Sequence, residues 1–97
     1  MKKFNSINDV RKEIDLIDLK ILDLIVDRKK LVVEVVKLKK RDQIIDQERI
    51  DKILKSLNKI GEEKGLPPQI VEAIWNAMIE SFIKFEEKFF DEIQKKR

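Results

Sequence analysis

The chain has 97 residues, the length of one domain, and contains no cysteine, no histidine, and only 2 glycines and 2 prolines. These counts exclude a disulfide scaffold, a zinc site built from thiolates or imidazoles, and catalysis by a cysteine or histidine nucleophile–base pair. The 22 basic and 19 acidic residues give a net charge of +3 with interleaved signs, which permits nucleic-acid binding without arguing for it.

The opening segment, MKKFNSIND, carries two lysines without an apolar core behind them, so we expect no signal peptide. No later stretch approaches the ~20 apolar residues of a membrane-spanning helix, and we expect a cytoplasmic location. Few glycines and prolines, with abundant Lys, Glu, Ile and Leu, predict an all-α fold in a single domain, residues 1–97.

The first predicted helix is very long. Ser6, followed three residues later by Asp9, resembles a capping box, and nothing stops the helix before about Arg41. Its apolar residues recur at alternating spacings of three and four, which is typical of a coiled-coil seam. The seam comprises Ile7, Val10, Ile14, Ile17, Ile21, Leu24, Leu31, Val35 and Leu38.

Two shorter helices follow a break at residues 42–46. Asp46 is a suitable N-cap for the second helix, and Gly65 a suitable left-handed residue after its end. Pro67 and Pro68 fit the opening of the third helix. The apolar positions are Ile50, Ile53, Leu54, Leu57 and Ile60 in the second helix, and Val71, Trp75, Met78, Ile79, Phe82, Phe85 and Phe89 in the third.

The length of the first helix predicts a symmetric homodimer. A helix of about 35 residues is about 52 Å long, whereas a compact domain of this size has a radius of gyration of about 12–13 Å. The chain cannot cover such a helix alone, and its far end would expose Val32, Val35, Val36 and Leu38. A second copy is the simplest cover. The alternative is a monomeric three-helix bundle with a protruding helix.

Two cations stand out on the first helix. Arg28 occupies a seam position, where a guanidinium is unfavourable unless it meets an anion or a carboxylate. Lys39 follows eleven residues later, three turns plus about 20°, so both side chains would point the same way and could converge on one small anion. The alternative is an internal salt bridge to Glu48, Glu80 or Glu86.

Glu86 and Arg11 are further candidates. Glu86 interrupts the aromatic face of the third helix, where a desolvated carboxyl group could stay protonated and donate a hydrogen bond, or pair with a lysine. Alternatively, a helix rotation sends it to solvent beside Glu87. Arg11 lies about 25 Å along the helix from Arg28. One chain cannot bring both to one small ligand, but an antiparallel second copy can; alternatively, Arg11 is an exposed surface residue.

Three segments contain most of these positions: VRKEIDLID at 10–18, LIVDRKKLVVEVVKLK at 24–39, and DQER at 46–49. They resemble the LRxxIDxID, LLxxRxxLxxxVxxxK and D-x-E-R motifs of the all-helical, type II chorismate mutases. The resemblance covers about residues 7 to 90. Its specific part is the joint spacing of Arg11, Arg28, Lys39, Glu48 and Arg49.

The resemblance implies an intertwined homodimer of three-helix chains that rearranges chorismate to prephenate, a step towards aromatic amino acids, without cofactor or metal. It implies that Arg28 and Lys39 of one chain, with Arg11 of the other, bind the two carboxylates of the substrate. Glu48 would accept a hydrogen bond from the ring hydroxyl, and Glu86 would lie beside the ether oxygen.

Three positions depart from the family pattern. Gln47 stands where many members have an arginine, and Phe82 where a small polar residue is frequent; both are candidates for additional pocket contacts. Ile44 stands where some members have an acidic residue. The related isochorismate–pyruvate lyases similarly lack that arginine and carry an aromatic residue near position 82, so the resemblance leaves chorismate and isochorismate both open as substrates.

The rearrangement needs no proton transfer and no covalent intermediate, so the residue types present suffice. The protein must hold a folded dianion and stabilise negative charge on the breaking ether oxygen, and arginines bind carboxylates bidentately. The competing class is a non-enzymatic helical module that binds RNA or a partner helix. It would expose cations and aromatic rings, whereas the aromatic residues here follow a core stripe, so we expect no nucleic-acid partner.

Overall fold

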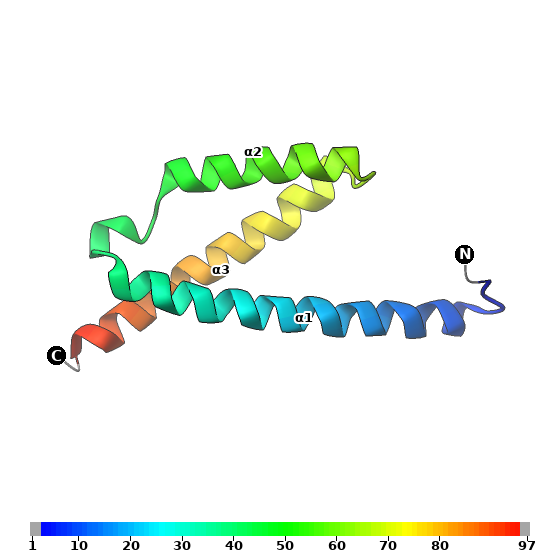
Figure 1. The fold of residues 1–97 in the computed structure, drawn as a ribbon, viewed down its shortest axis with the longest axis horizontal. Helices are drawn as coiled ribbons and strands as arrows, with labels where there is room; N and C mark the ends of the chain where they lie inside the picture. Colours follow the sequence, from blue (N-terminus) through cyan, green and yellow to red (C-terminus); the bar gives the residue numbers. More distant parts are fainter. Residues whose placement is uncertain (1–2, 96–97) are drawn as a thin grey trace. The chain divides into compact units, whose positions relative to one another are not determined.

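A computed structural model describes residues 3–95 and contains three α-helices in this range, which confirms the all-α prediction. Helix α1 spans Ile7–Leu38, α2 spans Gln47–Glu63 and α3 spans Pro68–Lys95 (Figure 1). A short 3₁₀ turn, η1, spans Arg41–Gln43 between α1 and α2. No helix among the described residues is long and apolar enough to cross a membrane. The chain forms two units that divide after Val32.

The first unit consists of α1 up to Val32 and the segment before it. The predicted N-cap is confirmed, because the Ser6 hydroxyl accepts the backbone N–H of Asp9 at 3.2 Å. The seam residues of α1 are exposed throughout, from Ile7 at 69% to Leu24 at 66% and Leu31 at 68%. An apolar helix face of this length, interrupted only by Arg28, is typical of an interaction surface.

The end of α1 differs from the prediction. The helix ends at Leu38, not near Arg41, because Lys40 is extended (φ −88°, ψ 163°) and turns the chain into η1. Val36 was expected to be exposed in a single chain without a partner, but only 1% of it is accessible, and it belongs to the core of the second unit. Val32 is half-buried. The turn after Leu38 lets the chain return towards its own core.

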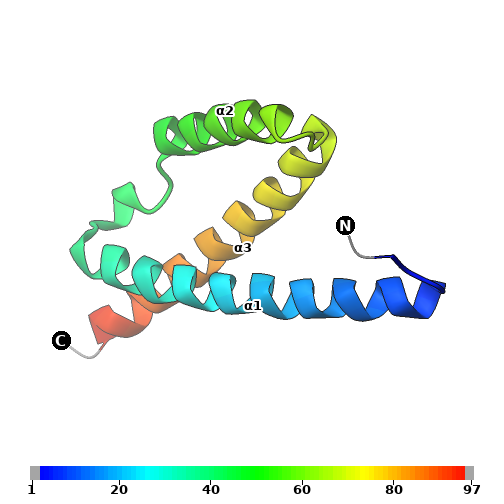
Figure 2. The same ribbon diagram turned by 45° about the vertical axis from the view of Figure 1, so that its right-hand side comes forward.

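The second unit, from Val33 onwards, contains a hairpin of α2 and α3 (Figure 2). The predicted start of α2 is confirmed, because the Asp46 carboxylate accepts the backbone N–H of Arg49 at 3.0 Å. The predicted end is confirmed as well. Gly65 has φ +84°, which favours glycine, and its N–H donates to the carbonyl of Glu62 at 3.1 Å. Pro68 opens α3, where a missing N–H is tolerated.

The two helices of the hairpin are in close contact at Gly61. A Cβ atom at this position would lie 2.9 Å from Cγ2 of Val71, a residue that is 2% exposed. The N–H of Leu66 donates to the Gly61 carbonyl at 2.7 Å and completes the turn between the helices. Within the described part of this unit, the buried apolar residues are Val36, Ile44, Val71, Ile79 and Phe90.

We predict that Gly61→Ala destabilises the fold, although alanine is the better helix former by about 1 kcal/mol. The added methyl group would overlap Val71, whose β-branched side chain has little freedom to move, and overpacking a core costs about 1–3 kcal/mol. Urea unfolding at fixed protein concentration measures the difference. Ser56→Ala on the exposed side of α2 is the control, and we expect it to be neutral or slightly stabilising. A stabilising Gly61→Ala would show that α2 and α3 are not in close contact there.

Candidate functional site

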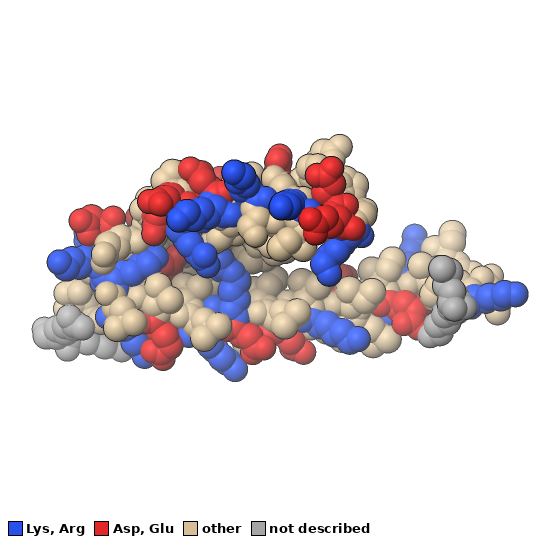
Figure 3. Space-filling view, turned by 45° about the horizontal axis from the view of Figure 1, so that its top comes forward, with Lys and Arg blue, Asp and Glu red and all other residues tan. Residues whose placement is uncertain are grey.

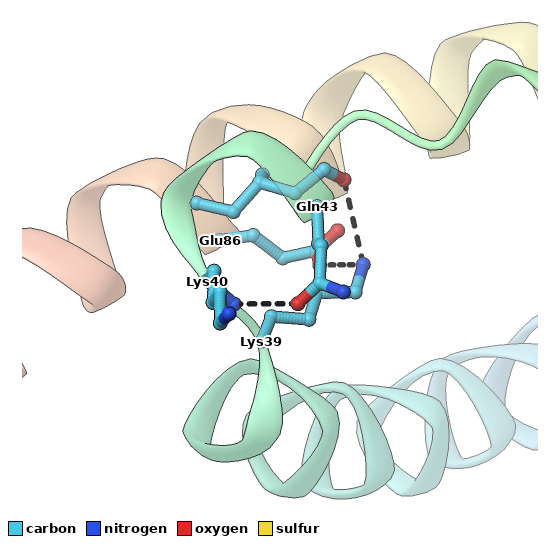
Figure 4. A network of polar contacts seen from close by, with 5 residues as sticks. Lys39, Lys40, Gln43 and Glu86 are labelled. Atoms are coloured by element: carbon cyan, nitrogen blue, oxygen red, sulfur yellow. Dashed lines mark hydrogen bonds and ion pairs between the residues drawn. The ribbon is translucent and has the colours of Figure 1, made fainter.

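An ion pair between Lys39 and Glu86 is the centre of the candidate site. Nζ of Lys39 lies 3.1 Å from Oε1 of Glu86, and the two side chains are only 22% and 11% exposed (Figure 4). Lys39 follows the last residue of α1, and Glu86 lies in α3. The alternative that helix rotation sends Glu86 to solvent is wrong, since Glu86 is 8% exposed and its neighbour Glu87 faces solvent.

The chain after Lys39 folds back to give the ammonium group a second acceptor. The backbone N–H of Lys40 donates to Oε1 of Gln43 at 2.8 Å, and the N–H of Gln43 donates to the Lys40 carbonyl at 2.9 Å. This turn brings the carbonyl of Ile44 to 3.4 Å from Nζ of Lys39. A lysine ammonium carries three N–H donors, so within residues 3–95 one donor stays available for a ligand.

A groove of about 450 Å³ lies beside Lys39, within the size range of small-molecule sites. It brings together two of the predicted site residues, Lys39 and Gln47. Lys39 lies beyond the end of α1, so the predicted helical alignment of Lys39 with Arg28 does not hold. Its lining comprises Val35, Leu38, Lys39, Asp42, Gln43, Ile45, Asp46 and Gln47. Among the described residues, no group of three or more acidic, histidine or cysteine side chains is arranged to hold a metal ion.

Glu48 and Gln47 lie in the first turn of α2 and make contacts within that helix. Glu48 is 81% exposed and pairs with Lys52 at 3.4 Å, in a surface where acidic and basic side chains interleave over α2 (Figure 3). The side-chain amide of Gln47 donates to Oδ1 of Asp51 at 2.9 Å. The carboxylate of Glu48 is therefore open to a ligand.

Phe82 lies one turn before Glu86 on α3 and is half-buried. Its ring meets that of Phe85 edge to face, with centroids 6.3 Å apart, and Phe85 stacks on Phe89 at 5.9 Å. Such pairs are favourable aromatic geometries. Phe82 is thus part of an aromatic row along α3, as the sequence pattern predicted.

Arg11 and Arg28 both belong to the first unit and are not brought together. Arg11 is exposed, whereas Arg28 is half-buried, with its Nη1 atom shielded from solvent. Both lie within the single helix α1, so their separation of 17 residues corresponds to about 25 Å. Within one chain, these two guanidinium groups cannot bind the same small molecule.

Sequence reasoning missed the roles of Ile44 and Arg41. Ile44 appeared only as a departure from an acidic position, but its side chain is 4% exposed and its carbonyl accepts from Lys39. Arg41 was expected at a helix end; instead it lies over the ring of Phe90 and pairs with Asp91. An isolated apolar pair, Ile44 and Ile45, inside a polar break was the available signal that this segment packs onto the core.

We predict that Lys39→Ala lowers the free energy of unfolding by about 1–3 kcal/mol, because it leaves the Glu86 carboxylate in a largely buried position without its cation. Urea unfolding measures this loss. The matched control is Lys37→Ala, which breaks an exposed pair with Glu34 whose side chains are 50% and 65% accessible; we expect a change below about 0.5 kcal/mol. Equal losses in the two variants would contradict a specific role for the buried pair in stability.

Comparison with known families places most of the chain in one of them. The profile of the family described as chorismate mutase type II matches residues 10–87, a range that contains the ion pair, the groove and both candidate arginines. Among curated proteins, no sequence matches significantly. The matched range spans α2 completely and most of α1 and α3. This three-helix chain belongs to the chorismate mutase type II family.

Proposed function

We propose that the chain is a homodimeric chorismate mutase, an isomerase that converts chorismate to prephenate, and that residues 1–97 act as one catalytic domain. Membership of the type II family supports chorismate mutase-type function in general. The observation that carries the proposal further is the Lys39–Glu86 pair, a partly buried ammonium group that is held by two acceptors beside an open groove.

The chemistry matches what these residues can supply. The rearrangement breaks a carbon–oxygen bond and forms a carbon–carbon bond within one molecule, and negative charge grows on the ether oxygen. A fixed ammonium group next to that oxygen stabilises the transition state more than the ground state. We assign this role to Lys39. The ion pair supports a role for Glu86 in holding Lys39 in place, rather than as a protonated donor to the substrate.

The two carboxylates of the substrate require further cations. By family resemblance, Arg28 of the same chain and Arg11 of the second copy supply them, and a guanidinium binds a carboxylate with two parallel hydrogen bonds. The exposed seam of α1 supports the inference of a second copy. Apolar seam residues such as Ile14 (49% exposed) and Ile17 (54% exposed) would be buried against a partner helix. The separation of about 25 Å between Arg11 and Arg28 along one helix also requires a second copy.

Three residues complete the proposed pocket. Glu48 accepts a hydrogen bond from the ring hydroxyl, for which its exposed position on α2 leaves it accessible. Gln47 lines the groove beside Lys39. Phe82 borders the site through its place one turn before Glu86. The reaction as proposed uses no cofactor and no metal.

A second candidate is isochorismate–pyruvate lyase. The resemblance supports it, because those relatives similarly lack an arginine at the position of Gln47, a residue that lines the groove here. Separate incubation of the purified protein with chorismate and with isochorismate distinguishes the two activities. Prephenate formed from chorismate supports the mutase, and salicylate with pyruvate formed from isochorismate supports the lyase. A folded dimer that converts neither would favour a non-enzymatic helical binding module.

For the shared site, we predict that Arg11→Ala and Arg28→Ala each abolish turnover in a protein that keeps its helical content. When the two variants are unfolded, mixed and refolded together, mixed dimers form, and one of their two sites has all its native arginines. Activity should then recover to about a quarter of wild type, because half the dimers are mixed and each has one intact site.

The mixed-dimer experiment has two internal checks. Each variant refolded alone must remain inactive, and sedimentation must show dimers at micromolar concentration. A folded wild-type monomer, or an absence of recovery in dimers that have been shown to mix, would contradict a site shared between two chains.

For Glu86, we predict that Glu86→Gln lowers kcat about tenfold, because a neutral amide holds the Lys39 ammonium less firmly than a carboxylate does. Steady-state kinetics at neutral pH measures this effect. The control is Glu87→Gln, the same change at the exposed neighbour, which should leave kcat unchanged. Retained or raised activity in Glu86→Gln would show instead that Glu86 acts as a protonated hydrogen-bond donor.

A further inference from the structure

The side chain of Arg41 connects the turn η1 to α3 through two contacts. Its guanidinium carbon lies 4.9 Å from the centre of the Phe90 ring, and its Nη2 atom forms an ion pair with Oδ1 of Asp91. Phe90 and Asp91 lie on α3 about one turn beyond Glu86. Stacking and pairing at the same time is a property of the planar guanidinium group, which a lysine side chain does not reproduce.

A surface hollow beside the turn leaves part of it without packed side chains. A hollow of about 170 Å³ is lined by Arg41, Asp42, Ile44, Ile45 and Glu87, from the turn and from α3. Close-packed side chains would fix the turn by contact alone, whereas a hollow leaves it room to shift. The side chain of Ile44 is buried at one end of the turn, and Arg41 is attached to α3 at the other.

The position of this turn determines the surroundings of Lys39. One of the two acceptors of the Lys39 ammonium is the carbonyl of Ile44, which belongs to the turn region, and the other is Glu86 on α3. The N–H of Ile44 in turn donates to the Arg41 carbonyl at 3.4 Å. A shift of Arg41 away from α3 would therefore move the Ile44 carbonyl relative to Glu86, and the two acceptors would no longer hold the ammonium together.

We propose that Arg41 is a positioning residue, which sets the place of the Lys39 ammonium group by attaching η1 to Phe90 and Asp91. The kinetic part of this inference rests on the proposed function; the part that concerns Lys39 does not. Arg41 and Asp91 are 63% and 50% exposed, and exposed ion pairs add little to global stability. Their contact is therefore expected to matter for local geometry and not for folding.

The first test measures the chemical reactivity of the Lys39 amine by brief reductive methylation and peptide mass spectrometry. In the wild type, Lys39 should react more slowly than exposed lysines such as Lys88, because it is 22% exposed and doubly hydrogen-bonded. Arg41→Ala and Asp91→Ala should each accelerate labelling of Lys39 several-fold, with unchanged thermal unfolding. Lys88→Ala, which removes an exposed cation from α3, is the matched control and should leave Lys39 protected.

Kinetics with chorismate then tests the consequence for turnover. Arg41→Ala should lower kcat by about tenfold with little change in KM, because a displaced ammonium loses transition-state contact while the arginines still bind the carboxylates. Arg41→Lys should restore little, since lysine cannot stack and pair at once. The double variant Arg41→Ala/Asp91→Ala should lose no more than Arg41→Ala alone, because both changes release the same contact.

The two readouts separate the two hypotheses. Unchanged Lys39 labelling in a folded Arg41→Ala protein would overturn the positioning role, whatever the turnover. Accelerated labelling of Lys39 with unchanged kcat would show that the positioning of Lys39 by Arg41 does not affect the reaction. If the wild type converted no substrate, the proposed function would fail, and the labelling result would still decide whether Arg41 places Lys39.

Discussion

The structure of the candidate site depends on one partly buried ion pair, between the ammonium of Lys39 and the carboxylate of Glu86. Placing a carboxylate among the aromatic residues of α3 is unfavourable unless a cation accompanies it. The chain supplies that cation from the segment directly after α1, and the early end of α1 at Leu38 is what allows it. The termination of α1, the extended Lys40 and the burial of Ile44 accompany the placement of Lys39 at this position.

A second constraint comes from the proportions of the chain. The 32-residue helix α1 exposes all nine predicted seam residues, while the apolar core of the second unit is small, with five buried apolar residues between positions 33 and 95. A chain of this composition gains much of its stabilisation only when the seam is covered. The proposed dimer covers the seam and supplies Arg11 of the second copy to each site. Assembly and activity are then coupled, since one contact surface both stabilises the protein and completes its site.

The proposed catalytic device is electrostatic and needs few groups. An ammonium held by a carboxylate and a carbonyl loses little freedom when substrate binds, so its interaction with developing charge is available in full at the transition state. The surrounding chain restricts its motion by weak and exposed contacts, among them Arg41 on Phe90 and Asp91. Local contacts of this kind can set a reactive geometry without contributing much to the free energy of folding.

Sequence patterns predicted the all-α class, the N-caps at Ser6 and Asp46, the glycine after α2 and the opening of α3 at Pro68, because these features depend on local hydrogen bonding and backbone freedom. The sequence also singled out Glu86, a charge within an apolar stripe, and Lys39, by its spacing of eleven residues from Arg28. It did not determine where α1 ends or that Val36 and Ile44 are buried. Those features accompany contacts between segments far apart in the sequence, such as Lys39 with Glu86 and Arg41 with Phe90, and tertiary contacts of this kind override helix propensity.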